Sequence, residues 1–120
     1  GGYCSLDAVN GNAVANGRVE WRRSVPAVVG GWTTDQANAV PADPILVVHN
    51  ESGRYVIPLS TGLARPDVAA ALKNPALENA GYESPADLRD VPVGSYDLSI
   101  VTSADGRHRC PLNVVLALVD

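Results

Sequence analysis

Stretches in which apolar and polar residues alternate make up much of this chain. Residues 94–101 alternate so that Tyr96, Leu98 and Ile100 share one face, which is typical of a strand with one buried side. Residues 19–21 alternate in the same way. Similar short apolar segments, separated by turn residues, predict further strands at 6–9, 13–15, 27–32, 82–88, 107–110 and 112–119.

Turn residues separate these segments at short intervals. Residues 44–49 form the strongest predicted strand, Asn50 to Gly53 predict a turn, and 54–59 predict the returning strand of a hairpin. Asn10-Gly11 and Asn16-Gly17 favour turns with positive φ, and Asp105-Gly106 predicts another hairpin turn. The pair Gly30-Gly31 lies inside a predicted strand, which indicates a bulge or a close backbone approach.

Helical patterns are confined to the middle of the chain. Pro66 and Asp67 stand where a helix beginning near 65 would favour them, and Val68 and Leu72 are four residues apart on one face. A second short turn is predicted at 75–80, ended by a glycine. These patterns predict a short helical insertion around residues 66–80.

Seven to nine short strands with one helical insertion predict a mainly β fold. The regular spacing favours a single antiparallel β-sandwich domain over residues 1–120, immunoglobulin-like in general shape. The cysteines lie near the two ends of the chain and not in the middle of the fold, so this likeness concerns the architecture only.

Cys4 and Cys110 are the two cysteines. Two cysteines are too few for a structural zinc site, and neither histidine has finger-like spacing. We expect a disulfide that joins the first strand to one of the last, with two buried free thiols as the alternative. A disulfide would place the domain in an oxidising compartment, periplasmic or extracellular. The chain has no Met, which fits an exported or excised domain.

The composition excludes several classes of function. Hydrophobic residues make up 46% and charged residues 18%, which argues against disorder. The net charge of −4 leaves no basic face, so we expect no nucleic-acid binding. The longest apolar runs, 68–72 and 114–119, are far below the roughly 20 residues of a membrane-spanning helix, so we expect no membrane insertion by this fragment.

The residues that could carry catalysis form no recognisable set. His49 and His108 are the two histidines, and no Gly-x-Ser-x-Gly motif accompanies them. The oxygen-bearing side chains within residues 7–12 lack the spacing of a calcium loop. We therefore predict no enzyme activity, no catalytic residues, no metal and no cofactor, and a small hydrolase is the less favoured alternative.

Two tryptophans could bind a ligand. Trp21 is flanked by charged residues and is the better candidate for an exposed binding platform. Trp32 could pair with Asp35 on a sugar, but the favoured interpretation is that it fills the core between the sheets, since the chain has no Phe.

A second group of candidates surrounds the helical insertion. Arg65 and Asp67 could form a recognition loop, or Asp67 could cap the helix while Arg65 bridges to a carboxylate on a strand. Tyr82 and Glu83 complete the candidate ligand-binding residues.

Four segments occur in an order that resembles a known group of domains: 30–35 (GGWTTD), 65–69 (RPDVA), 79–83 (NAGYE) and 93–98 (VGSYDL). The chain resembles small β-sandwich domains attached to bacterial membrane proteins of surface-polysaccharide synthesis, such as integral-membrane glycosyltransferases. The resemblance implies a periplasmic accessory domain and supplies no catalytic residues.

These observations together predict a non-catalytic domain in the periplasm or outside the cell. Its expected partner is cell-envelope glycan, or a protein such as a membrane-anchored parent. The alternative is a purely structural protein-interaction module.

Overall fold

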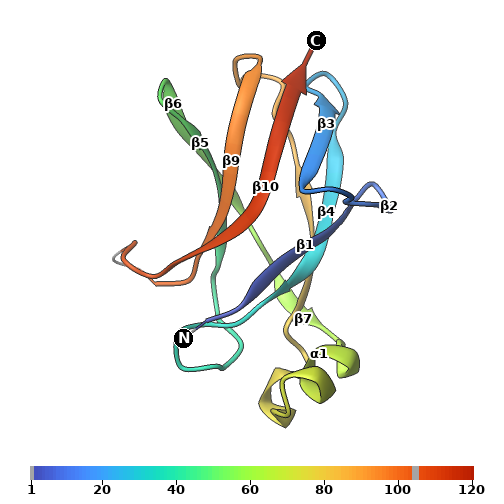
Figure 1. Ribbon diagram of the computed structural model, residues 1–120, viewed down its shortest axis with the longest axis vertical. Helices are drawn as coiled ribbons and strands as arrows, with labels where there is room; N and C mark the ends of the chain where they lie inside the picture. The colour runs from blue at the N-terminus through green and yellow to red at the C-terminus, as the bar shows by residue number, and fades with distance from the viewer. Residues whose placement is uncertain (1, 104–105) are drawn as a thin grey trace.

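The computed structural model describes residues 2–103 and 106–120, and in it two five-stranded sheets pack face to face (Figure 1). The first sheet holds, in order, β2 (Asn12–Ala13), β1 (Cys4–Val9), β4 (Ala27–Thr33), β8 (Gly81–Ala86) and β7 (Thr61–Leu63). The second holds β3 (Arg18–Arg22), β10 (Arg109–Val119), β9 (Gly94–Val101), β5 (Ile45–Asn50) and β6 (Gly53–Pro58).

Antiparallel pairing dominates both sheets. Among the described strands only β3 and β10 run parallel, with Val115 opposite Arg18. The predicted mainly β sandwich is therefore confirmed, and its immunoglobulin-like character stays a prediction.

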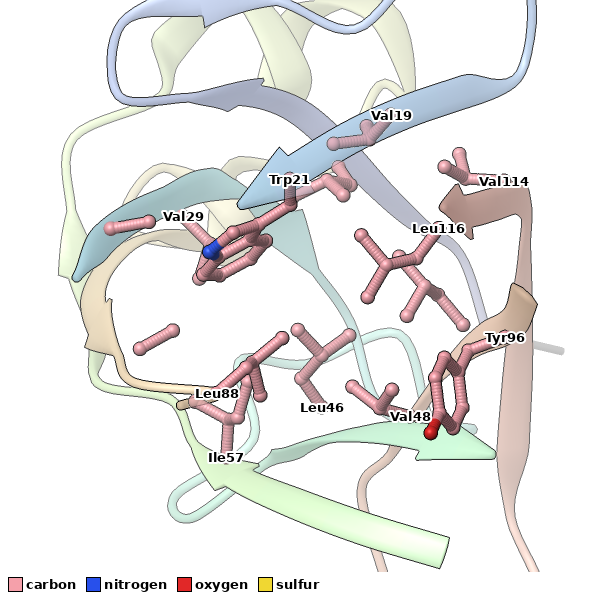
Figure 2. Close-up of a cluster of buried hydrophobic side chains, with 14 of the residues drawn as sticks. Val19, Trp21, Val29, Leu46, Val48, Ile57, Leu88, Tyr96, Val114 and Leu116 are labelled. Atoms are coloured by element: carbon pink, nitrogen blue, oxygen red, sulfur yellow. The ribbon is translucent and has the colours of Figure 1, made fainter. Parts of the chain in front are cut away.

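Apolar side chains from both sheets fill the space between them (Figure 2). Trp21 of β3 lies in this core with 7% of its surface exposed, and its Nε1 donates a hydrogen bond to the backbone oxygen of Val25 at 3.1 Å. Burying the indole while pairing its N–H satisfies both parts of the side chain. The prediction that Trp21 forms an exposed platform is therefore wrong.

The predicted hairpin is confirmed by β5 and β6. Asn50 pairs with Gly53, so the turn itself is shorter than predicted and consists of Glu51 and Ser52. Positive φ at Asn10 (52°) and Asn16 (59°) confirms the two Asn-Gly turns.

Other parts of the chain differ from the prediction. The two final strands are one strand, β10, with an irregularity between Pro111 and Val115. The predicted strand at 13–15 is reduced to the two-residue β2, and β7 was not predicted. Of the predicted Asp105-Gly106 turn, Asp105 lies outside the described residues.

The double glycine of β4 marks both a bulge and a close approach, as predicted. Opposite it, the register of β1 shifts between Leu6 and Ala8. A Cβ atom at Gly31 would lie 2.0 Å from the backbone oxygen of Ser5, so only glycine fits there without a shift of the backbone.

The helical insertion is confirmed as α1 (Pro66–Ala71) followed by a 3-10 turn, η1 (Pro75–Leu77). It has its own small apolar cluster of Val68, Leu77 and Ala80, and the half-buried Trp32 packs against this cluster. The favoured interpretation that Trp32 fills the core between the sheets is therefore wrong. The insertion provides the apolar surface that this indole needs.

Cys4 and Cys110 form a disulfide, with an S–S distance of 2.04 Å. It links β1 of the first sheet to β10 of the second, which confirms the predicted pairing. Disulfides persist in oxidising compartments, so the bond indicates a location outside the cytoplasm. Within residues 2–103 and 106–120, no helix has the length and apolar character needed to cross a membrane.

Candidate functional site

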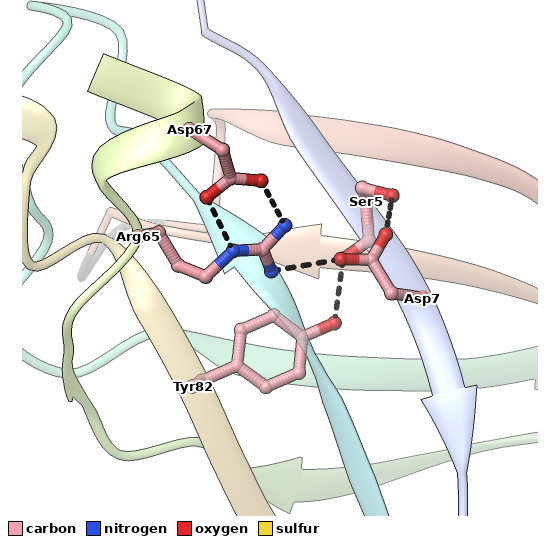
Figure 3. Close-up of polar contacts among 5 residues, drawn as sticks. All are labelled: Ser5, Asp7, Arg65, Asp67 and Tyr82. Carbon is pink, nitrogen blue, oxygen red and sulfur yellow. Dashed lines mark hydrogen bonds and ion pairs between the residues drawn. The ribbon is translucent and has the colours of Figure 1, made fainter. Parts of the chain in front are cut away.

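Three of the predicted site residues meet at the base of the insertion. Arg65, Asp67 and Tyr82 converge there with two residues of β1, Ser5 and Asp7 (Figure 3). We call these five residues the Arg65 cluster. They come from three segments that are far apart in the sequence.

The guanidinium of Arg65 binds two carboxylates at once. Its Nε and Nη2 donate to the two oxygens of Asp67, each at 3.0 Å, and its Nη1 donates to Oδ2 of Asp7 at 2.8 Å. A two-point contact of this kind is stronger and more specific than a single ion pair. The predicted bridge from Arg65 to a strand carboxylate is therefore confirmed, and its partner is Asp7. The predicted capping of the helix by Asp67 is wrong, because no side chain among the described residues caps the start of α1 and Asp67 binds Arg65 instead.

The bulge of β1 gives Asp7 its position. The register shift between Leu6 and Ala8 leaves Asp7 without a partner in the ladder with β4. Its Oδ1 accepts a hydrogen bond from Ser5 Oγ at 2.6 Å. The bulge thus turns a strand residue into the acidic partner of Arg65.

Tyr82 lies beneath these charges with 1% of its surface exposed. Its hydroxyl donates to the backbone oxygen of Ser5 at 2.8 Å. Burial, and then the negative charge of Asp7, raise the pKa of Tyr82 well above its ordinary value. Tyr82 therefore stays neutral and acts as a hydrogen-bond donor.

Hydrogen bonds from Arg65 lower the pKa of Asp67 below its ordinary value. The bonds to Asp67, and then the bond to Asp7, raise the pKa of Arg65. Arg65 and Asp67 are therefore both charged near neutral pH.

A glycine makes room for the arginine. A Cβ atom at Gly81 would lie 2.7 Å from Cγ of Arg65 and 2.9 Å from the backbone oxygen of Leu63. The glycine before Tyr82 therefore meets a steric need of the cluster.

The side chains of the Arg65 cluster bind within the cluster. Each of its five side chains already has a hydrogen-bond or ion-pair partner. Its one aliphatic hydroxyl, Ser5 Oγ, donates to Asp7, and no histidine lies among the five residues to act as a base. Its contacts attach the start of the insertion to β1.

The other predicted site residues lie elsewhere. Asp35 accepts hydrogen bonds from the backbone N–H groups of Ala37 (2.8 Å) and Ala39 (3.0 Å), so it shapes the loop after β4. Glu83 is exposed on β8 and lines a shallow hollow of about 380 Å³ on the first sheet. Trp21 and Trp32 lie in two different apolar clusters.

Sequence reasoning missed Ser5 and Asp7 as partners of Arg65. The available signal was the carboxylate of Asp7 inside an otherwise apolar segment, 6–9, where a plain strand would not favour it. Its partner could not be read from the sequence, since Arg65 is 58 residues further along.

The part of the chain that the structure describes contains no group of three or more His, Cys, Asp or Glu side chains placed to hold a metal ion. Comparisons of the chain with models of protein families, with curated proteins and with solved structures found no match.

Proposed function

We propose that this chain is a non-catalytic accessory domain outside the cytoplasm. In this proposal it belongs to a bacterial membrane protein of surface-polysaccharide synthesis, faces the periplasm, and binds cell-envelope glycan. The Cys4–Cys110 disulfide carries the proposal, because a bond between the first and one of the last strands suits a domain that works in an oxidising compartment.

The segments behind the family resemblance support an accessory role. Gly31 allows the close approach of β1 and β4. Arg65, Asp67 and Tyr82 belong to the Arg65 cluster. Gly81 leaves the space that the side chain of Arg65 occupies. Three of the four resembling segments therefore build one structural feature. Residues that hold a domain together need not resemble those that bind its ligand, so the ligand has to be sought elsewhere on the surface.

The chemistry of the Arg65 cluster supports a role without catalysis. Catalytic arginines and carboxylates must be available to a substrate, whereas Arg65 uses its Nε, Nη1 and Nη2 atoms on Asp7 and Asp67.

One observation favours the alternative, a protein-interaction module. β6 forms an edge of the second sheet, and Val56 on it is 50% exposed. An exposed edge strand can pair with a strand of a partner protein.

An NMR titration tests the proposal. The ¹⁵N-labelled domain, with its disulfide intact, is titrated with soluble polysaccharide fragments released from bacterial cell envelopes. We expect saturable shifts confined to one surface. Two results together would favour the interaction module instead. No polysaccharide fraction would shift any signal, and a detergent-solubilised membrane protein would capture the domain through β6.

A further inference from the structure

The outer face of the second sheet is hollowed where β10 departs from β9. Pro111 pairs with Ser99 and Val115 pairs with Asp97, so β10 has three residues between these pairs where β9 has one. Asn113, in the middle of the three, has a φ of 57°. The extra length lifts β10 locally out of the ladder and leaves a hollow of about 580 Å³.

A buried hydroxyl without a partner lies at this hollow. Ser99 is 2% exposed, and its Oγ is the one buried side-chain polar atom in residues 2–103 and 106–120 that lacks a hydrogen bond. Ser99 lines the hollow and alternates with Leu98 and Ile100, which pack in the core, so its side chain belongs to the outer face. Buried polar groups are almost always hydrogen-bonded, so this hydroxyl calls for a partner from outside the chain.

Four further polar side chains surround the same hollow. His49 and Asp97 are cross-strand neighbours on β5 and β9, and Arg109 and Asn113 come from β10 on either side of Pro111. In the part of the chain that the structure describes, none of these four side chains forms a hydrogen bond or an ion pair. The Arg65 cluster shows the opposite situation, since its groups bind one another.

The hollow combines hydrogen-bonding groups of every kind with apolar surface. Arg109 can donate, Asp97 can accept, and Ser99 and Asn113 can do both. Val115, which is 37% exposed, and Pro111 supply apolar contacts beside them. A sugar ring needs this mixture, because each hydroxyl both donates and accepts while the C–H groups of the ring present an apolar face.

We infer that this hollow is a binding site for a short oligosaccharide, with the hydroxyl of Ser99 bonded to a sugar hydroxyl at its floor. The inference rests on the proposed function and adds to it the place and the chemistry of glycan recognition. Asp97 and Arg109 hold the ligand from the rim, and Val115 contacts the ring.

The test uses three pure probes at millimolar concentration: cellotetraose, chitotetraose and tetragalacturonate. Each is titrated into the ¹⁵N-labelled, disulfide-bonded chain. We expect at least one to shift the amide signals of Asp97, Ser99, Asn113 and Val115 together.

Variants then test the individual residues. Ser99→Ala is expected to raise the Kd about fivefold and Arg109→Gln about tenfold, from the usual contributions of a neutral and a charged hydrogen bond. Ser95→Ala and Arg54→Gln are matched controls, because both are exposed on β9 and β6 and neither lines the hollow. The controls are expected to leave the Kd within about twofold.

The urea midpoint of Ser99→Ala shows whether Ser99 has a binding role or a structural one. Because its hydroxyl has no partner in the free chain, Ser99→Ala is expected to leave the urea midpoint unchanged or slightly raised. A lowered midpoint with an unchanged Kd would overturn the inference.

The titration also separates this inference from the proposed function. Shifts confined to another surface would overturn the site while glycan binding stands. If none of the three probes shifts the signals of Asp97, Ser99, Asn113 and Val115, and the envelope fragments shift signals only elsewhere, the site fails. If the envelope fragments shift no signal at all, the glycan-binding part of the proposed function fails as well.

Discussion

The two adjacent glycines of β4 have very different surroundings. A Cβ atom at Gly31 would lie 2.0 Å from Ser5 O and 2.6 Å from the hydroxyl of Tyr82, whereas at Gly30 the nearest atom is Tyr82 O at 3.7 Å. The Gly31→Ala contact is with the backbone of β1 and cannot be relieved by turning a side chain. We expect Gly31→Ala to lower the free energy of unfolding by about 2–3 kcal/mol.

Gly30→Ala is the matched control for this change. It adds the same methyl group one residue away, in ordinary van der Waals space. Its free energy of unfolding is expected to stay within about 0.5 kcal/mol of the wild-type value. Urea denaturation of the two variants measures this difference. Equal losses of unfolding free energy would contradict the prediction that the close approach of β1 makes Gly31 the more sensitive position.

The tryptophans show why single residues were harder to predict than strands. The alternation of Val19, Glu20 and Trp21 correctly predicted a strand with one buried face. The same alternation places the charged neighbours of Trp21 on the opposite face, so they say nothing about the exposure of the indole. Trp32 was misplaced for another reason, since its apolar partners belong to the insertion, more than thirty residues away.

At the scale of elements, the insertion is held by one ion-pair system. Because Arg65 stabilises ionised Asp67, the pKa of this carboxyl is below its ordinary value of 3.8. A lowered pKa in the folded state means that the ionised group stabilises the fold above pH 3.8 and that this contribution is lost as the pH falls through the folded value. The attachment of α1 should therefore weaken at acid pH.

Replacing the arginine tests this attachment. In Arg65→Gln we expect the carboxyl carbon of Asp67, followed by ¹³C NMR, to titrate close to 3.8 and higher than in the wild type. Asp87 is the internal control, because the backbone N–H and side chain of Arg89 lower its pKa independently. An unchanged titration of Asp67 would show that Arg65 is not its main partner.

Elements that depend on local pattern were predicted well, and those that depend on distant pairing were not. The β5–β6 hairpin and the start of α1 follow from turn residues and proline placement. By contrast, β7 has three residues and exists because it pairs with β8. The continuity of β10 across Pro111, and with it the hollow, results from pairing with β9 at residues 109–111 and again at residues 115–118.

In the whole molecule, the Cys4–Cys110 disulfide cross-links the two sheets, and its cysteines lie near the two ends of the chain. Cys4 and Cys110 are 106 residues apart in sequence, so their bond closes almost the entire chain into one loop. Closing a loop of that size restricts the unfolded state by about 4.7 kcal/mol in the chain-entropy model. The cysteines lie near the ends of this chain, unlike those of antibody-type domains. This position gives the disulfide a large effect on stability.

Removing the bond should weaken the fold without changing its topology, because the sheets keep their hydrogen bonds and the core its apolar contacts. We expect the double variant Cys4→Ser/Cys110→Ser to lose about 3–5 kcal/mol of unfolding free energy, measured by urea denaturation. Reductant should lower the wild-type midpoint to that of the variant and leave the variant itself unaffected. The intact mass of the wild type should rise by about two daltons on reduction, one hydrogen for each sulfur. A wild-type midpoint that does not respond to reductant would mean that the bond does not form, and with it the assignment to an oxidising compartment would lose its basis.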